Sequence, residues 1–588
     1  MRNSTSRRRT TLALAAGLAI GLALAGCAAT TTGANDPSSQ PIEQSDSVLG
    51  NYLAARHAAR IKDIGRARYH YDRVLATEPA NLALQRQAFL MRLQDGKFES
   101  AKELADLLID ELDNGAPVAR LFLIVEAVRD GRFDDAAEQL TQLPDSRLNR
   151  ILGPLLETWV AVGRGRIDEA RGALTALNTL DGFDGLQALH SAMMADALGQ
   201  TGDAQRAYET ALALRAQSPL RLRLIAASFF ARNGNTERAL AIIREGDQRA
   251  SAPETLEAII QRIAADPSAP PPTATEGMAE GFFDLASALQ RDRGADMALV
   301  FARLALRLNP RFDLAALLIA EIQDDRGQHD AALAIYNEIP PASPYRLMAT
   351  LRAVGSLEDL NRLDEAVVAL DDLAATHPDR IDPLVRLGDL NRGREAWDKA
   401  IEAYDRVVAN VGTPEPRHWS LFYSRGIALE RSGRWADAEA DFLEALSLRP
   451  DEPYVLNYLG YSWVDRGINL ERARTMIEKA VELRPNDGYI IDSLGWALYR
   501  MGEFTSAVEV LERATELRPT DPTINDHLGD AYWRVGRRVE ARFQWRRALG
   551  FEPDSTLEPV LRQKLRNGLD DTSSPRVNTA HSAGATAG

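Results

Sequence analysis

A pattern that returns about every 34 residues limits the fold of this chain more than any other feature. One clear copy places apolar residues at Ala507, Leu511 and Ala514, which share one face of a helix, and ends at Pro519. The small residue of this pattern occurs at fourteen positions, namely Ala67, Ala101, Ala136, Ala170, Ala207, Ala239, Ala298, Ala332, Ala366, Ala400, Ala438, Ala473, Ala507 and Ala541. A unit of this length cannot bury its apolar face alone and must stack on its neighbours. The repeats therefore predict an all-α solenoid.

A glycine precedes the small residue by twelve positions in several of the later copies, at Gly388, Gly426, Gly495 and Gly529. Glycine in the middle of a helix costs about 1 kcal/mol relative to alanine, so its presence there needs a compensating gain. We expect that gain to be close packing, with the glycine of one helix facing the alanine of the next. Each unit is therefore predicted to be two helices joined by a turn.

Two short motifs, Leu459-Gly460-Tyr461 and Leu494-Gly495-Trp496, lie in the first helix of their units. Together with the period, they resemble the first helix of the tetratricopeptide repeat (TPR). The resemblance covers approximately residues 50 to 555. It implies a right-handed superhelical solenoid of about fourteen helix–turn–helix repeats.

The regular spacing is interrupted once, between Ala239 and Ala298, where the sequence contains a proline-rich stretch. We expect two solenoid segments, residues 48–250 with about six repeats and residues 277–555 with about eight, separated by a stiff break over 251–276. Leucines at spacing four after the last repeat predict a capping helix over 556–569. Residues 570–588 are rich in Ser, Thr, Ala, Gly and Asn, which is typical of a disordered tail.

The first 26 residues have the composition of a signal peptide. Four arginines precede an apolar run from Leu12 to Ala25, which is too short to span a bilayer as a permanent helix. The run ends at Cys27, the only cysteine of the chain. This arrangement resembles the lipobox of bacterial lipoproteins, which implies that Cys27 carries fatty acyl chains such as palmitate and that residues 27–47 form a lipidated, disordered tether. A cleaved signal followed by an incidental cysteine is the alternative.

The N-terminal residues also bear on the net charge of the mature protein and on its cellular compartment. The formal net charge is −15, and the signal contains arginines but no acidic residue, so the remainder is more acidic still. Such a charge argues against nucleic acid or an anionic lipid surface as the main ligand. By resemblance to other lipoproteins, Ala28 after the cysteine favours the periplasmic face of the outer membrane. Export by the general secretory route or by the twin-arginine route remains open.

No sequence motif indicates catalysis. The eight histidines do not occur at metal-ligand spacing, no glycine-rich phosphate loop is present, and few residues follow Pro553. We therefore expect neither an enzyme nor a cofactor or metal site, apart from the lipid on Cys27.

A partner-binding groove is predicted along the first helices of the last three repeats, because first helices line the inside of such a superhelix. Corresponding positions carry acceptors, aromatic rings and arginines, namely Asn457, Tyr461, Asp492, Trp496, Tyr499, Arg500, Asp526, Asp530, Trp533 and Arg534. This mixture is enriched at protein-binding hot spots. The aromatic residues could instead belong to the repeat core, but unpaired carboxylates are expensive to bury.

The runs Leu456–Gly467, Asp492–Arg500 and Ile524–Arg534 resemble a family of proteobacterial TPR lipoproteins. A more distant similarity, clearest in the C-terminal repeats, is to the periplasmic lipoprotein adaptor of a C-terminal processing protease. This resemblance implies a protein–protein adaptor that brings such a protease to envelope substrates, including cell-wall hydrolases. A scaffold for envelope assembly or export machinery without a protease is the alternative. The identity of the partner, the repeats that bind it and the oligomeric state remain open.

Overall fold

The computed structural model describes residues 47–569, apart from 111–115, 147, 181, 215–219, 246–258, 264–269, 292–293 and 379. Within this part, the chain forms helices joined by turns, and no strand occurs. The signal peptide, Cys27, nearly all of the tether, the tail from 570 and most of the proline-rich break lie outside the described residues. No described helix is long and apolar enough to cross a bilayer.

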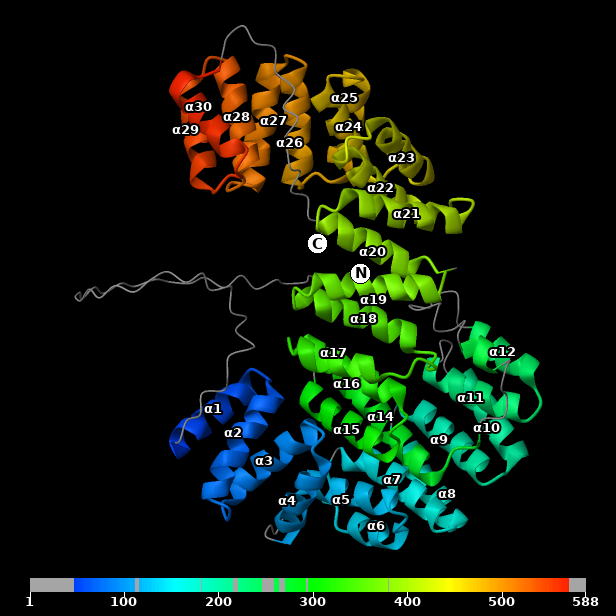
Figure 1. Ribbon diagram of the computed structural model, residues 1–588. Helices are drawn as coiled ribbons and strands as arrows, with labels where there is room; N and C mark the ends of the chain where they lie inside the picture. Colours follow the sequence, from blue (N-terminus) through cyan, green and yellow to red (C-terminus); the bar gives the residue numbers. More distant parts are fainter. Residues whose placement is uncertain are drawn as a thin grey trace.

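In the part of the chain that the structure describes, twelve helices pair into six hairpins before the break, and we call them the N-terminal arm. Figure 1 shows their arrangement. Their bounds are α1 (Val48–Arg60), α2 (Ile64–Thr77), α3 (Leu82–Gln94), α4 (Phe98–Asp110), α5 (Pro117–Arg129), α6 (Phe133–Leu140), α7 (Asn149–Gly163), α8 (Ile167–Thr175), α9 (Asp184–Ala197), α10 (Thr201–Ala213), α11 (Leu220–Arg232) and α12 (Thr236–Arg244).

Eight further hairpins follow the break and end in the single helix α30 (Leu557–Asn567). Their bounds are α14 (Ala274–Arg291), α15 (Ala295–Leu308), α16 (Asp313–Asp325), α17 (His329–Glu338), α18 (Arg346–Asp359), α19 (Leu363–Thr376), α20 (Asp382–Gly393), α21 (Trp397–Val411), α22 (Trp419–Arg431), α23 (Trp435–Leu448), α24 (Pro453–Arg466), α25 (Leu470–Leu483), α26 (Gly488–Arg500), α27 (Phe504–Leu517), α28 (Pro522–Arg534) and α29 (Arg538–Gly550). We call α16–α30 the C-terminal arm. The described residues thus contain fourteen hairpins, and the predicted all-α solenoid is confirmed.

Each hairpin is closed by the residues that define the repeat. In most described hairpins the first helix ends at a glycine in the left-handed region, such as Gly502 with φ 85°, where a residue with a Cβ would be strained. The small residue of the second helix is fully buried, as at Ala507. A Cβ added to Gly495 would lie 2.5 Å from the side chain of Leu511. The predicted close packing is therefore present, but the glycine faces the apolar side chain four residues after the alanine.

One repeat has a different register from the prediction. Ala204 is fully buried and lies 34 residues after Ala170, whereas Ala207 is only partly buried. Tyr208 and Ala211, at four and seven residues after Ala204, are buried as the pattern requires. The choice of Ala207 was therefore wrong, because a small residue three positions later lies on almost the same helix face.

The first hairpin after the break lies against the N-terminal arm. Helix α14 packs on α7 and α9, and α15 packs on α3 and α5, so both contact first helices of the N-terminal hairpins. In Figure 1, α14 and α15 lie next to the blue and cyan helices of that arm. Gly277 of α14 approaches Trp159 of α7 so closely that an added Cβ would lie 2.3 Å from the indole ring. The break therefore returns the chain onto the inner surface of its own N-terminal arm.

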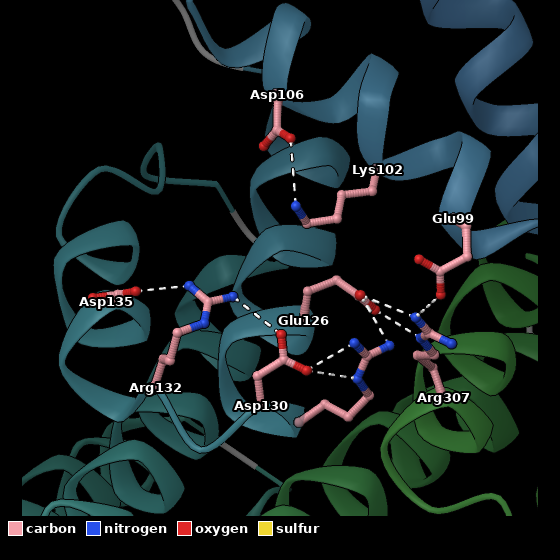
Figure 2. Close-up of polar contacts among 9 residues, drawn as sticks. Glu99, Lys102, Asp106, Glu126, Asp130, Arg132, Asp135 and Arg307 are labelled. Carbon is pink, nitrogen blue, oxygen red and sulfur yellow. Dashed lines mark hydrogen bonds and ion pairs between the residues drawn. The ribbon is translucent and has the colours of Figure 1, made fainter.

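Buried ion pairs hold this contact together. Figure 2 shows Arg307 of α15 directed toward Glu126 of α5 and Glu99 of α4. The guanidinium hydrogen-bonds to both oxygens of Glu126, at 2.7 and 3.0 Å, and to Glu99 at 2.6 Å. On α14, the carboxylate of Glu280 accepts three hydrogen bonds of 2.6–3.0 Å from Arg221 of α11. Glu126 and Glu280 are each 1% exposed, so the arginines compensate carboxylates that water does not reach.

One apolar core consequently extends across the break, from Ala55 to Ala403. The interpretation of residues 48–250 and 277–555 as two separately packed segments is wrong in this respect. The physical reason is that the break is followed by a helix whose small residues, Gly277 and Gly281, allow close approach to α7 and α9. Spacing along the sequence does not reveal this contact, because the partners are not neighbouring repeats.

Candidate partner-binding surface

The ten residues predicted to form a groove all lie on α24, α26 and α28, the first helices of three consecutive hairpins. Helix α24 contacts α26, and α26 contacts α28. Contacts between successive first helices place these helices on the inside of the curve, where a groove was predicted. The structure therefore brings the ten residues together along one line of helices, but it leaves few of them accessible.

Asp526 and Asp530 lie beneath the terminal helix α30. The ammonium group of Lys564, on α30, is 2.7 Å from the Asp526 carboxylate and 2.8 Å from that of Asp530. Asp530 also accepts a hydrogen bond of 2.9 Å from the indole nitrogen of Trp545. Both carboxylates are buried and paired, so the expectation that they line an open groove is wrong. The cap supplies the cation that makes their burial possible.

A stack of three rings crosses from α26 to α28. The indole of Trp496 lies nearly parallel to the rings of Tyr499, at 4.7 Å, and His527, at 4.1 Å. His527 Nδ1 is 3.0 Å from both carboxylate oxygens of Asp492. Tyr499 and Asp492 are buried, whereas Trp496 is half-buried. Asp492 therefore anchors the neighbouring repeat through His527 and is not a free acceptor.

Burial and neighbouring charges shift the pKa values of this cluster. Burial lowers the pKa of His527, but the carboxylate of Asp492 outweighs burial, so the pKa of His527 lies above its ordinary value. Burial raises the pKa of Asp530 to about 6, although Lys564 acts in the opposite direction. Burial also raises the pKa of the Tyr499 hydroxyl to about 12. The pKa values of all three groups therefore lie above their ordinary values.

Trp533 and the two arginines are also less accessible than predicted. Trp533 is buried and donates its indole N–H to the carbonyl of Leu569, at 3.1 Å. The side chain of Arg500 is only 7% exposed and hydrogen-bonds to the carbonyl of Asp465 at 3.4 Å, so its predicted exposure is wrong. Arg534 is half-buried, with Nε 3.3 Å from the Tyr499 hydroxyl. These side chains connect adjacent repeats.

Five of the ten residues remain partly exposed. Arg500 and Arg534 make the contacts described above, and we call the other three, Asn457, Tyr461 and Trp496, the inner trough. Asn457 and Tyr461 are one turn apart on α24, and both are half-buried. The Oδ1 atom of Asn457 is buried and has no hydrogen-bond partner among the described residues. Burial first, and then the charges of Asp492 and Asp465, raise the pKa of Tyr461. The trough thus combines a buried amide oxygen that lacks a partner among the described residues with the partly exposed side chains of Tyr461 and Trp496.

The structure also contains a cavity beside two other first helices, which the sequence did not predict. A cavity of about 340 Å³ lies between α16 and α18 and is lined by Glu321, Asp324, Asp325, His329, Tyr336, Arg352, Gly355, Ser356 and Asp359. Asp324 accepts hydrogen bonds from Tyr336 at 3.0 Å and from Ser356 at 2.9 Å. Glu321 is paired with Arg352 at 3.0 Å. No group of His, Cys, Asp or Glu in the described part of the chain is arranged to hold a metal ion.

Comparison with known proteins agrees with the repeat architecture. A family model described as TPR repeat matches residues 495–536, and one described as tetratricopeptide repeat matches residues 192–253 and 423–488. A TPR repeat-containing protein of Pseudomonas aeruginosa is 26% identical over 196 residues, which cover 33% of this chain and 32% of that protein. This chain therefore spans about a third of the length of that relative.

Among solved structures, the APC/C hetero-tetramer Cut9–Hcn1 aligns over 89% of this chain and 97% of the solved chain, at 15% identity and a TM-score of 0.35. YrrB, described as a TPR protein with an unusual peptide-binding site, aligns over 33% of this chain and 98% of its own, at 19% identity and a TM-score of 0.27. The helical hairpins and the family models agree on the same unit. The chain carries tetratricopeptide repeats, and its fold is the solenoid that such repeats build.

Proposed function

We propose that this chain is a lipid-anchored periplasmic scaffold that binds a protein partner through the inner trough of its C-terminal arm. The observation that carries the proposal is the set Asn457, Tyr461 and Trp496. It combines a buried acceptor without a partner among the described residues, a half-buried tyrosine and a half-buried indole. Polar groups beside an aromatic ring are the elements of protein-binding hot spots.

The packing of the N-terminal arm favours the C-terminal arm as the binding site. Solenoids of this kind use their concave face for binding. In the N-terminal arm, α14 and α15 of the same chain lie against the first helices that would offer this face. The first helices from α18 to α26 have no such covering segment in the described part of the chain. A partner segment is therefore expected to lie along these helices and reach the trough.

The membrane anchor is proposed from the sequence. The apolar run that ends at Cys27 supports cleavage and lipid attachment there, and Ala28 supports delivery to the periplasmic face of the outer membrane. Two or more acyl chains would hold the protein stably at the bilayer. No catalytic role is proposed.

We propose that the partner is a C-terminal processing protease, which the scaffold brings to envelope substrates such as cell-wall hydrolases. This identity rests on the resemblance of the C-terminal repeats to a protease adaptor. The trough fits an extended segment of a partner, because the amide of Asn457 can pair with a peptide group and Trp496 can pack against an apolar side chain.

Co-purification from mildly crosslinked detergent extracts tests the proposal. The variants are Tyr461→Ala with Trp496→Ala, and the matched control is Phe543→Ala, an exposed ring on the outer helix α29. We expect the double variant to lose at least tenfold in partner recovery and the control to equal the wild type. A PDZ-containing serine protease among the recovered proteins would support the adaptor. Subunits of an assembly or export machine would favour a scaffold without a protease, and full recovery by the double variant would remove the trough as the site.

A further inference from the structure

The two ends of the solenoid differ in how their outermost helices are covered. At the C-terminal end, α30 covers the last hairpin with the buried side chains of Leu557 and Leu561. At the N-terminal end, α1 is the outermost described helix, and Leu49 and Leu53 are 65% and 56% exposed. The end of a solenoid normally needs a polar outer face to remain soluble. The apolar face of α1 therefore calls for an explanation.

One continuous stripe runs along the uncovered face of α1. Leu49, Leu53, Arg56 and Arg60 are spaced by four, three and four residues, so they share one side of the helix, and all four are exposed. The opposite side, which contains Asn51, Ala55 and Ala58, is buried. The stripe begins with apolar side chains and ends with basic ones.

The charge of α1 is opposite to that of the whole chain. The chain has a net charge of −15, yet α1 contains no Asp or Glu. Arg60 contacts the ring nitrogen of His57 at 3.3 Å, and Arg56 lies 5.8 Å from the ring of Tyr52. Neither arginine forms a salt bridge with a described residue. Both guanidinium groups are therefore available to an anionic partner.

We infer that α1 docks on the surface of an anionic bilayer, with Leu49 and Leu53 entering the boundary of the acyl chains and Arg56 and Arg60 contacting lipid phosphates. Apolar side chains flanked by arginines are typical of helices that lie in a membrane interface. This inference rests on the lipid anchor proposed above. About twenty residues separate Cys27 from Val48, so the chain between them reaches at most about 75 Å, and α1 stays close to the membrane.

Other occupants fit the stripe less well. The sequence from residue 28 to 46 offers Ile42 as its one large apolar side chain and includes three acidic residues, so it cannot supply an apolar cover for two leucines. A second copy paired in parallel through the same face would place Arg56 and Arg60 near their own equivalents, and like charges repel. Antiparallel pairing would place the same arginines against Leu49 and Leu53 of the other copy, where no anionic group meets them. An anionic bilayer satisfies both the apolar and the basic part of the stripe.

Vesicle binding of the unlipidated chain tests the inference. The protein is the chain from residue 27 onward with Cys27→Ser, and the vesicles contain phosphatidylcholine with or without 30% phosphatidylglycerol. We expect binding to the anionic vesicles, at least tenfold weaker binding for Leu49→Glu with Leu53→Glu, and about fivefold weaker binding for each of Arg56→Gln and Arg60→Gln. Neutral vesicles should show little effect of the arginine changes. Leu107→Glu with Val368→Glu is the matched control, since both side chains are about half exposed on other helices.

Two outcomes would overturn the inference. The first is no binding of the unlipidated chain to anionic vesicles, and the second is equal binding by the leucine variant. A dimer in light scattering that the leucine variant dissociates would identify a second copy as the occupant instead. Membrane fractionation of the wild-type chain against Cys27→Ser reports the lipid anchor alone. The vesicle assay contains no lipid on residue 27, so failure of the anchor and failure of α1 docking can be distinguished.

Discussion

Replacing Arg307 with methionine tests whether α15 and the N-terminal arm form one unit. Glu126 is 1% exposed, and its cationic partners are Arg307 at 2.7 Å and Arg129 at 3.0 Å. Removing one partner of a buried ion pair costs about 3–5 kcal/mol. Because Arg129 remains, we expect about 3 kcal/mol, which is a hundredfold change in the equilibrium between closed and locally open states.

Hydrogen exchange resolved by peptide is the appropriate assay, since a solenoid need not unfold in one step. Protection should fall about a hundredfold in α3, α5 and α15 together and stay unchanged in α26–α29. The second change Glu126→Met should restore most of the protection, because an apolar pair of similar volume can replace a buried ion pair. Lys62→Met is the control at the same contact, since its pair with Asp296 is about half exposed and contributes at most about 1 kcal/mol. Loss of protection confined to α15 would refute the shared core.

Three further predictions follow from the packing. Gly277→Leu should separate α14 from α7 and lower the melting temperature. The fluorescence of the buried indole of Trp159 should shift to longer wavelength, and an unchanged emission spectrum would contradict the close approach of the two helices. Ala507→Arg places an unpaired charge at a fully buried position and should cost several kcal/mol, with exchange protection lost in α24–α29 and retained in α1–α15. The pKa of Asp530 is raised to about 6, so its contribution to stability is present at low pH and is lost as the pH rises through 6. Protection of α28–α30, corrected for intrinsic exchange, should therefore be higher at pH 5 than at pH 7.5, and Asp530→Asn should reduce this difference.

The repeat itself could be predicted from the sequence because its cause is local. A glycine such as Gly495 packs against Leu511, four residues after the small residue Ala507 of the same hairpin, so the spacing is fixed by two helices and a turn. The register at Ala207 failed because two alanines three residues apart, Ala204 and Ala207, satisfy nearly the same helix face. The apolar pattern of one helix does not choose between them, whereas the 34-residue spacing from Ala170 selects Ala204.

The accessibility of the candidate site could not be predicted in the same way. Asp526 is buried because Lys564 of α30 lies 2.7 Å away, and the spacing of the repeats gives no indication of how α30 is oriented. Asp492 pairs with His527 of the following repeat, and a histidine has no fixed place in the pattern. The positions of the inner helices were predicted correctly, but the partners that neutralise their charges depend on contacts outside the period.

The contact between α15 and the N-terminal arm also determines how the molecule responds to force. A free solenoid stretches like a coil spring, because each hairpin touches only the next one. Here α15 also packs against α3 and α5, so hairpins that are far apart in the sequence are held in contact. We therefore expect elongation under load to be smaller between α3 and α15 than in the helices from α18 onward. A chain held at the bilayer by one end and at a partner by the other would act as a stiff base that carries a compliant arm.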